Sequence, residues 1–136
     1  MVREHRKSNC PINYALELFG DRWTLLIVRD LMFKGKHYYG EFLKSEEKIA
    51  TNILASRLAM LEEAHIIEKS VDPAHASKII YRLTEKGIDL VPVLIEVIKW
   101  SSKHDKNTAA DMKFINRAKR NREALTKEIS NQLRSN

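Results

Sequence analysis

The segment Ile49-Ala-Thr-Asn-Ile-Leu-Ala-Ser-Arg-Leu-Ala-Met-Leu-Glu62 decides how the rest of this 136-residue chain is organised. Leu54, Leu58 and Leu61 recur at positions i, i+4 and i+7, which is the spacing of one face of an α-helix. The opposite face carries short side chains, where an ordinary solvated helix would carry lysine and glutamate. We therefore expect a helix over 50–62 that is buried on its leucine side and presents a small, hydrogen-bonding surface on the other.

The residues around this helix predict a compact motif. Two β-branched and apolar runs, 66–71 and 78–83, flank a turn-rich tip at 72–77 and together predict a β-hairpin. A short helix is expected at 40–45, just before the long one, whose N-cap we place at Thr51. A short helix, a second helix and a hairpin, in this order, are typical of a winged helix-turn-helix, in which the second helix enters the DNA major groove.

Two further helices are expected before this motif. Pro11 is pre-set for a first helical turn, so the sequence predicts a helix from there to Gly20. Asp21 is the N-cap candidate of a second helix, 22–33, which is apolar on most sides and therefore belongs at the centre of the domain. The short extended piece at 37–39 could pair with the hairpin.

The chain after the hairpin is expected to be helical. Thr84 is the predicted N-cap of a long helix that reaches Trp100 and carries more apolar surface than one small domain needs. We interpret this surface as a homodimer interface; the alternative is that it closes the domain's own core. Residues 101–111 are expected to form a polar linker, and 112–134 a further helix. The charged side of that helix either is solvated while the helix packs in the dimer, or contacts phosphates.

The predicted fold class is α+β and mainly α: a winged helix-turn-helix DNA-binding domain at 10–100 with N- and C-terminal dimerisation helices. A flexible N-terminal arm at 1–9 precedes this domain, and a basic, helical C-terminal extension at 101–136 follows it.

Composition limits the class of protein. The net charge of +6 is concentrated in the extension, because 101–136 holds 9 Lys and Arg against 4 Asp and Glu, while 1–100 holds 15 against 14. Net charge is therefore a weak argument for nucleic acid here. No apolar run is long enough to cross a bilayer, the first residues do not have the pattern of a signal peptide, and a single cysteine excludes an intramolecular disulfide framework. We expect a cytoplasmic protein that does not associate with membranes.

Nothing in the sequence favours an enzyme. The five histidines are scattered without the spacing of metal ligands, and neither a glycine-rich phosphate loop nor a nucleophile elbow is present. We therefore expect no catalytic residue, no metal site and no cofactor.

Several short motifs extend over about 10–100. They are Cys10-Pro11 with Ala15-Leu16; Gly20-x-x-Trp23 with Leu25-Leu26-Ile27 and Arg29; Tyr39-Gly40-Glu41-Phe42; Ile49 with Leu54-x-x-x-Leu58-x-x-Leu61-Glu62; and Tyr81-x-Leu83-Thr84-Glu85-x-Gly87 with Leu90-x-Pro92-Val93-Leu94 and Trp100. Taken one at a time they are weak signals, but together they are specific. With these motifs the chain resembles the HxlR-type winged helix-turn-helix regulators, a bacterial and archaeal family related in fold to the MarR type.

This resemblance implies a homodimeric transcription factor that binds double-stranded DNA at a roughly two-fold operator. The sequence departs from the family pattern in three places. Ala55 and Ala59 stand where the family often has long polar side chains, the tip of the wing is poorer in proline, and the tail after Ser101 is longer than is common.

Contacts to DNA can be assigned as hypotheses. Asn52 and Ser56 would face base edges, while Ala55 and Ala59 could contact thymine methyl groups. Arg57 would take a guanine or a phosphate. Ala50 begins the helix in the major groove and is a further candidate. The others would contact the phosphate backbone, or at the wing the backbone or the neighbouring minor groove: Thr51, Lys36, Lys44 and Lys48, and at the wing His75, Ser77 and Lys78. The plainer interpretation of each is a solvated surface residue.

Cys10 is the candidate for regulation. Some family members use a cysteine near this place to sense oxidants or electrophiles, and a thiol at a helix N-terminus favours the reactive thiolate. Arg6 and Lys7 would help, and any disulfide would have to be intermolecular or with a small thiol. The alternative is an inert, half-buried residue. The identity of a small-molecule or electrophile effector is open.

Two other functions compete with operator recognition. A winged-helix protein-interaction module would fit the short side chains of the reading helix and the nearly neutral first 100 residues. Sequence-independent DNA binding through the basic tail would show strong salt dependence without base preference.

Overall fold

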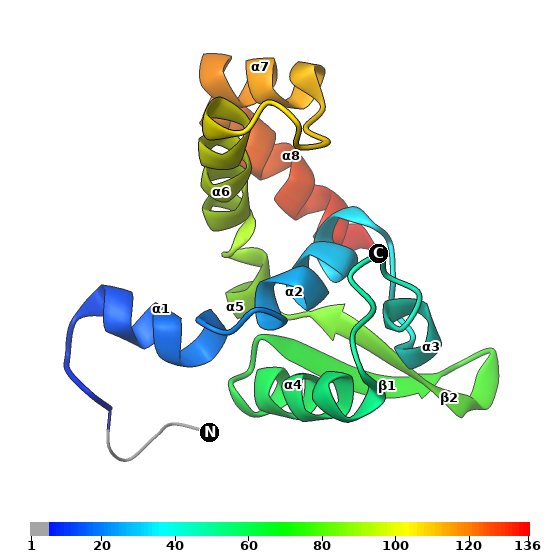
Figure 1. Ribbon diagram of the computed structural model, residues 1–136. Helices are drawn as coiled ribbons and strands as arrows, with labels where there is room; N and C mark the ends of the chain where they lie inside the picture. Colours follow the sequence, from blue (N-terminus) through cyan, green and yellow to red (C-terminus); the bar gives the residue numbers. More distant parts are fainter. Residues whose placement is uncertain (1–5) are drawn as a thin grey trace. The chain divides into compact units, whose positions relative to one another are not determined.

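The computed structural model describes residues 6–136, so most of the predicted arm at 1–9 lies outside the described residues. The described chain is mainly helical, with one two-stranded antiparallel sheet, which confirms the predicted fold class (Figure 1). It divides into two compact units, the first ending at Gly87 and the second covering 88–136. No helix among these residues is long and apolar enough to span a membrane.

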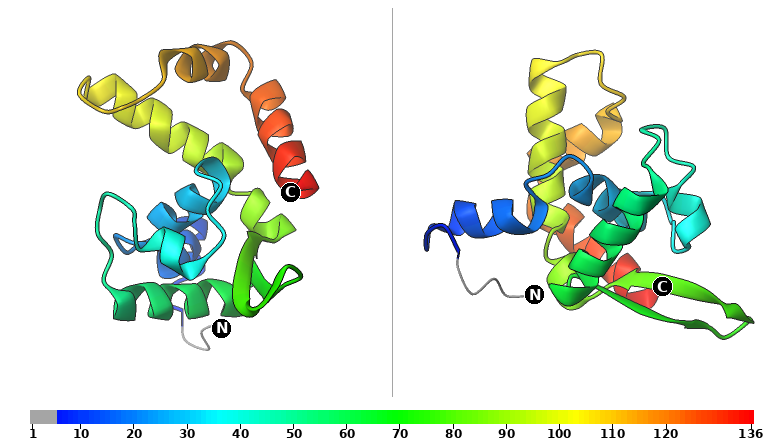
Figure 2. Two further views of the ribbon diagram at one scale, coloured as in Figure 1. Left: turned by 90° about the vertical axis from the view of Figure 1, so that its right-hand side faces the viewer. Right: turned by 60° about the horizontal axis from the view of Figure 1, so that its bottom comes forward.

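The first unit contains the predicted helix-turn-helix and hairpin (Figure 2). Its central helix carries six buried side chains, which confirms that this apolar segment belongs to the core. The elements are α1 (Pro11–Phe19), α2 (Thr24–Phe33), α3 (Tyr39–Phe42), α4 (Thr51–Glu63), β1 (Ile67–Asp72), β2 (His75–Leu83) and α5 (Glu85–Ile88), the last of which crosses into the second unit.

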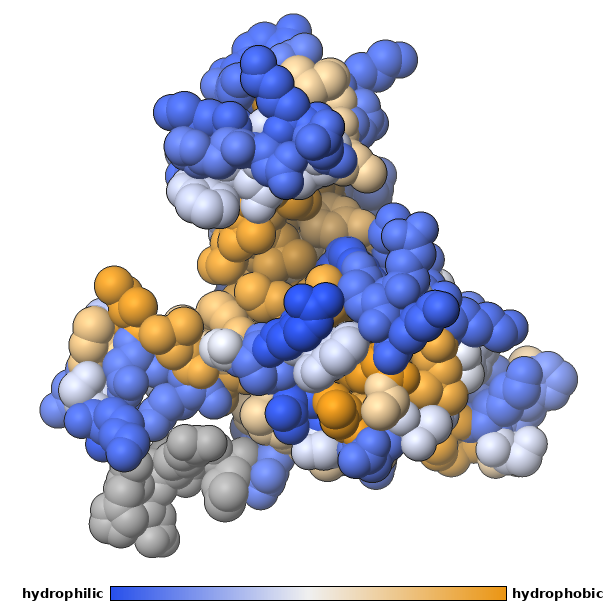
Figure 3. Space-filling view, in the orientation of Figure 1, coloured by the Kyte–Doolittle hydropathy of each residue, from blue (hydrophilic) through white to orange (hydrophobic). Residues whose placement is uncertain are grey.

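Helix α1 ends where predicted, but its apolar side is not buried by any part of residues 6–136. Gly20 closes the helix, and a Cβ there would lie 2.4 Å from the carbonyl oxygen of Leu16, so only glycine fits. No residue of α1 is buried, and Ile12 and Leu16 remain 71% and 58% exposed. Figure 3 shows apolar side chains gathered over this helix.

The start of α4 differs from the prediction by one residue. Ala50 is the N-cap residue, with extended backbone angles, and its carbonyl oxygen accepts the first helical hydrogen bond from Leu54 N–H at 2.9 Å. Thr51 is therefore the first helical residue, and the prediction of Thr51 as N-cap was wrong. The helix ends before His65, whose φ of 61° turns the chain into β1.

The hairpin is longer and its tip tighter than predicted. Strand β2 begins at His75, so the turn consists of Pro73 and Ala74 and not of 72–77. The reason is Asp72, whose carboxylate accepts a hydrogen bond from Ala74 N–H at 2.9 Å and closes the turn early. The extended piece before α3 pairs with the hairpin as expected, because Tyr81 N–H donates to the carbonyl oxygen of His37 at 2.8 Å.

The base of the hairpin is held by the residues that follow β2. Thr84 caps α5 as predicted, with Gly87 N–H donating to its hydroxyl oxygen at 3.2 Å, and its own N–H donates to the carbonyl oxygen of Ile66 at 3.0 Å. A Cβ at Gly87 would lie 2.3 Å from that same carbonyl oxygen. A glycine is therefore required at this position, although it weakens the helix.

The predicted long helix after Thr84 is broken, and so is the one predicted at 112–134. Pro92 has no N–H and its ring would clash with the carbonyl of Ile88, so α5 ends there and α6 (Val91–His104) starts anew. Because α6 extends to His104, the linker consists of 105–111 and is shorter than the predicted 101–111. Asn121 adopts non-helical angles and accepts a hydrogen bond from Ala124 N–H at 3.1 Å, which separates α7 (Met112–Arg120) from α8 (Arg122–Ser135).

The second unit is a cluster of these three helices. Each of α6, α7 and α8 contacts the other two, and Ile115 and Leu125 are buried among them. Ion pairs of Arg117 with Glu128 and of Arg122 with Glu96 join the helices at the surface.

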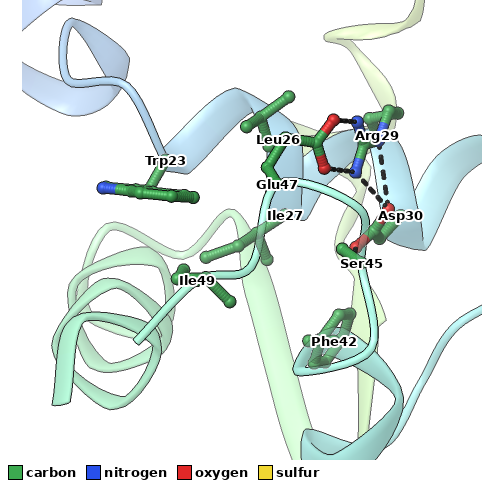
Figure 4. Close-up of a pocket in the computed structure, with 9 residues that line it drawn as sticks. All are labelled: Trp23, Leu26, Ile27, Arg29, Asp30, Phe42, Ser45, Glu47 and Ile49. Atoms are coloured by element: carbon green, nitrogen blue, oxygen red, sulfur yellow. Dashed lines mark hydrogen bonds and ion pairs between the residues drawn. The ribbon is translucent and has the colours of Figure 1, made fainter. Parts of the chain in front are cut away.

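A polar clamp joins α2 to the turn before α4 (Figure 4). The Arg29 guanidinium donates two hydrogen bonds to the Glu47 carboxylate, at 2.6 and 2.9 Å, and two more to Asp30. Asp30 is 2% exposed and also accepts from the Ser45 hydroxyl. The pocket beside this clamp has room for about one water molecule, so it is a packing defect and not a ligand site.

The clamp predicts an acid-sensitive stability. The hydrogen bonds from Arg29 lower the pKa of Glu47 from 4.5 to about 2. Because the pKa is lower in the folded protein, the stabilisation is complete above about pH 4.5 and is lost as the pH falls toward 2. We expect Glu47→Gln to lower the free energy of unfolding by about 1–2 kcal/mol at pH 7 and by much less at pH 3, measured by urea unfolding.

Glu46→Gln is the matched control for this prediction. Glu46 precedes Glu47 in the same turn and is exposed, so its loss should change stability little at either pH. A penalty for Glu47→Gln that is equal at pH 7 and pH 3 would contradict the assignment of the effect to the Arg29–Glu47 pair.

Candidate nucleic-acid interface

The outer side of α4 is an exposed surface of small side chains. The three leucines of the helix are buried, at 0–3% exposure, and this fixes which side faces outward. The exposed residues of the helix and its N-cap include every small or hydrogen-bonding residue predicted to face DNA: Ala50, Thr51, Asn52, Ala55, Ser56 and Ala59. A surface of this kind can approach the floor of a groove closely, because no long side chain stands between the helix backbone and the bases.

The N-terminal end of this surface is fixed by α3. The Tyr39 hydroxyl donates to the carbonyl oxygen of Thr51 at 2.9 Å, which ties the first turn of α4 to the preceding helix. Ile49 is buried just before it. The sequence predicts Tyr39 as part of an extended piece, whereas it is the first residue of α3. Its contact with Thr51 could not be predicted, because a hydroxyl-to-backbone contact across a turn leaves no periodic pattern.

Arg57 does not extend freely into solvent. Its Nε–H donates to the Asp21 carboxylate at 2.9 Å, and its Nη1 donates to the Ser56 hydroxyl at 3.2 Å. The side chain is about a third exposed. The structure therefore brings Ser56 and Arg57 together, and it adds Asp21. The prediction of Asp21 as the N-cap residue was wrong, because α2 begins at Thr24 with Trp23 in the N-cap position.

The three lysines proposed as phosphate contacts have different surroundings. Lys44 and Lys48 are exposed on the segment between α3 and α4. Lys36 instead points toward protein groups: its Nζ donates to Ser45 Oγ at 2.9 Å and lies 3.6 Å from the buried Asp30 carboxylate. The charge of Lys36 compensates that of Asp30, so its ammonium group is less available to a phosphate than those of Lys44 and Lys48.

The wing residues are all exposed, and the tip is anchored from outside the hairpin. His75, Ser77 and Lys78 lie exposed on β2, with the Lys78 ammonium 5.4 Å from the centre of the Tyr38 ring. The Tyr38 hydroxyl donates to the Asp72 carboxylate at 2.6 Å. This hydrogen bond lowers the pKa of Asp72 and raises the pKa of Tyr38.

The Tyr38–Asp72 contact was missed from the sequence. The two residues are 34 positions apart, and neither belongs to a recognisable motif. Their hydrogen bond ties the tip of the wing to the segment that precedes α3.

Cys10 is an exposed free thiol at the N-cap position of α1. Its carbonyl oxygen accepts the first helical hydrogen bond, from Tyr14 N–H at 3.0 Å. The Arg6 guanidinium lies over the Tyr14 ring, 5.9 Å from its centre, so the basic group expected beside the thiol is engaged with an aromatic ring. Among residues 6–136, no group of three potential metal ligands is close enough to hold a metal ion.

Comparison with known proteins gives consistent matches. The family model described as HxlR-like helix-turn-helix matches residues 18–109. The HTH-type transcriptional regulator YodB of Bacillus subtilis is 39% identical over 93 residues, which cover 68% of this chain and 82% of YodB. An uncharacterised HTH-type transcriptional regulator of Synechocystis, sll1512, is 36% identical over 93 residues, 68% of either chain.

Two solved structures also superpose on this chain. The crystal structure of PA1607 superposes with a TM-score of 0.70 at 35% identity, covering 80% of this chain and 76% of that one. Reduced YodB superposes with a TM-score of 0.59 at 35% identity, covering 71% and 94%. The region matched by the family model, 18–109, contains α4 and the hairpin. The chain therefore belongs to the HxlR-like helix-turn-helix family and is a transcriptional regulator of the winged-helix, MarR-like type.

Proposed function

We propose that this regulator acts in the cytoplasm as a homodimer that recognises a two-fold operator, with α4 in the major groove and the wing on the backbone or in the minor groove. The observation that carries this proposal is the exposed face of α4, which has small hydrogen-bonding side chains and is fixed by the buried leucines behind it. Helix insertion into the major groove is the binding mode of helix-turn-helix proteins.

Base reading is assigned to two side chains. Asn52 is exposed and can bond adenine through both its donor and its acceptor. Ser56 lies one helical turn later and can serve several bases, while Ala55 and Ala59 can contact thymine methyl groups. Because most side chains on this face of α4 are short, we expect few direct base contacts in each half-site.

Phosphate contacts set the register of the helix on the duplex. The exposed Lys44 and Lys48 and the first residue of α4, Thr51, are suited to this role at one end of the reading helix. At the wing, Lys78 is the main candidate, with His75 and Ser77 beside it along β2. Arg57 is assigned to a phosphate, because its hydrogen bond to Asp21 keeps the guanidinium at the edge of the exposed face of α4.

Dimer formation is supported by two exposed apolar surfaces, one in each unit. On α1, Ile12 and Leu16 are exposed. On α6, Val93, Val97 and Trp100 are 37%, 46% and 67% exposed. Surfaces of this kind are typical of protein interfaces, and a second copy of the chain is the partner that a two-fold operator requires. Two copies would place their reading helices about 34 Å apart, one turn of DNA.

Regulation through Cys10 is supported by its exposure and by the relatives. A structure of the redox regulator HypR in its oxidised form superposes with a TM-score of 0.61 at 27% identity, and YodB has been solved after diamide treatment and with bound quinone. We propose that the Cys10 thiolate adds to an electrophilic carbon of a quinone or, when diamide or another oxidant takes up two electrons, is oxidised to a disulfide with a small thiol or with Cys10 of a second copy. All three change the N-cap of α1, one of the surfaces assigned to the dimer.

The alternative is a winged-helix module that binds a protein or binds DNA without reading its sequence. The nearly balanced charge of residues 1–100 and the short side chains of α4 favour it. Selection experiments separate the two functions.

The first test is selection of binding sites from random duplex DNA with the reduced full chain. We expect a two-fold motif that is preferred over scrambled DNA by about 10³-fold. The titration should be made at about 150 mM salt, where non-specific binding is weak. Enrichment of no sequence, with weak and steeply salt-dependent binding, would favour the alternative function.

The division between base and phosphate contacts is tested by two variants. We expect Asn52→Ala to cost about 1–3 kcal/mol of binding free energy on the selected duplex and to relax the preference at one base position. Lys78→Ala should weaken all sequences alike and reduce the dependence of the affinity on salt. Equal losses of specificity from the two variants, measured by competition between duplexes, would contradict the assignment.

The role of Cys10 is tested by Cys10→Ser, since serine is close to cysteine in size but has no thiol, and the Cys10 side chain makes no capping hydrogen bond that the change could remove. We expect the wild-type complex with DNA to dissociate on treatment with diamide or a quinone, and the variant complex to remain bound in a gel-shift experiment. Dissociation of both complexes to the same extent would place the sensing elsewhere.

A further inference from the structure

The carboxylate of Asp21 is held firmly at the start of α2. Its Oδ2 accepts hydrogen bonds from Trp23 N–H at 2.9 Å and from Thr24 N–H at 3.2 Å, while its Oδ1 accepts from the Thr24 hydroxyl. Thr24 is fully buried. Three donors from the first turn of the central helix therefore fix both oxygens, so this carboxylate is a rigid point on the surface of the first unit.

The same carboxylate reaches across to the reading helix. Arg57 Nε–H donates to Oδ2 at 2.9 Å, although the two residues are 36 positions apart. Partial burial alone would raise the pKa of Asp21, but the hydrogen bonds from Thr24 and Arg57 outweigh burial and lower that pKa below its ordinary value. Asp21 therefore stays charged near neutral pH, and the pair remains intact.

The guanidinium of Arg57 keeps unused donors. Arginine has five N–H groups, of which one on Nε is directed to Asp21 and one on Nη1 to Ser56. No partner for Nη2 is found within residues 6–136. The plane of the guanidinium is thus set by two contacts, while its remaining donors are available at the edge of the exposed face of α4.

We propose that Asp21 is a positioning residue for DNA binding: it holds the Arg57 guanidinium in the orientation in which its free N–H groups meet a phosphate beside the major groove. The inference rests on the proposed function. A free arginine would have to be ordered when DNA binds, and this lost rotamer freedom weakens binding. Asp21 removes that loss by ordering the side chain in advance.

The sign of one substitution separates this role from simple charge repulsion. Asp21 places a negative charge near the phosphates, so if it had no other role, neutralising it would strengthen DNA binding. If Asp21 positions Arg57, neutralising it must weaken binding. Asp21→Asn is suited to the comparison because asparagine keeps a side-chain oxygen that can accept from Trp23 N–H and Thr24 N–H, while it loses the charge that strengthens the hydrogen bond from Arg57.

We expect Asp21→Asn to weaken binding of the selected duplex by about 3- to 10-fold, the range of one ordered hydrogen-bonded contact. Arg57→Gln should cause a similar loss, and adding Asp21→Asn to Arg57→Gln should cause no further loss, because both act through one guanidinium. Affinity of Asp21→Asn equal to or tighter than that of the wild type would overturn the proposal. So would additive losses in the double variant.

Glu46→Gln is the matched control. It removes the same charge from an exposed residue in the turn before α4, so binding should stay equal or become tighter. The unfolding midpoints of all variants are measured alongside. If Asp21→Asn is unstable, Arg57→Gln alone decides: unchanged affinity for DNA would overturn the proposal.

The same measurement on random DNA keeps this inference separate from operator recognition. Phosphate contacts do not depend on sequence, so Asp21→Asn must also weaken binding to a random duplex of about 30 base pairs at about 50 mM salt. If no motif is selected, operator recognition is contradicted. The affinities of the wild type and Asp21→Asn for random DNA can still be compared. In the free protein, the Arg57 Nε–H resonance should shift and broaden in Asp21→Asn; an unchanged resonance would contradict the pairing.

Discussion

The burial of Leu54, Leu58 and Leu61 is the constraint on which the rest of the first unit depends. Exposing a buried leucine costs about 1.5–3 kcal/mol, so turning α4 about its axis would cost several such terms at once. The direction in which the opposite side of the helix faces is therefore fixed by burial, and the contacts from Tyr39 and Asp21 act in addition. This lets the outward residues be chosen for what they bind, because none of them is needed to hold the helix in place.

Polar contacts around Asp30 are a second constraint on the first unit. Asp30 is buried in α2, and its carboxylate is compensated by Arg29, Ser45 and Lys36. A buried charge that lost these partners would be strongly destabilising. The segment from Lys36 to Glu47, which contains α3, is thus tied to the central helix at both of its ends. The position of the turn that leads into α4 follows from electrostatics as well as from packing.

The sequence predicted what depends on periodicity and little of what depends on single contacts. The leucine repeat, the apolar central helix and the alternation of the hairpin each extend over many residues, so one misplaced residue does not hide them. The errors occurred where one residue decides: Ala50 takes the cap expected of Thr51, Pro92 breaks a long apolar run, and Asn121 divides a helix. Each of these could be argued only after the neighbouring carbonyl or N–H had been placed.

The candidate site was predicted in the same uneven way. The exposed residues of α4 follow from the helix period once the leucines are known to be buried. The links from Asp21 to Arg57 and from Tyr38 to Asp72 join residues more than 30 positions apart, and no local pattern indicates them. They determine how side chains on the reading surface and the wing are held, which is why a list of candidate contacts could be drawn from the sequence but their restraints could not.

The two ends of the hairpin differ in how much change they can accept. At its base, Thr84 and Gly87 are in close contact with the backbone of Ile66, and not even a methyl group can be added at Gly87. At its tip, Pro73 and Ala74 are exposed, and the pairing register of the two strands already shifts between Val71 and Asp72. Residues could be inserted at the tip without disturbing α4. Wing length and helix sequence are therefore separable variables, through which relatives with one scaffold could diverge in the DNA they occupy.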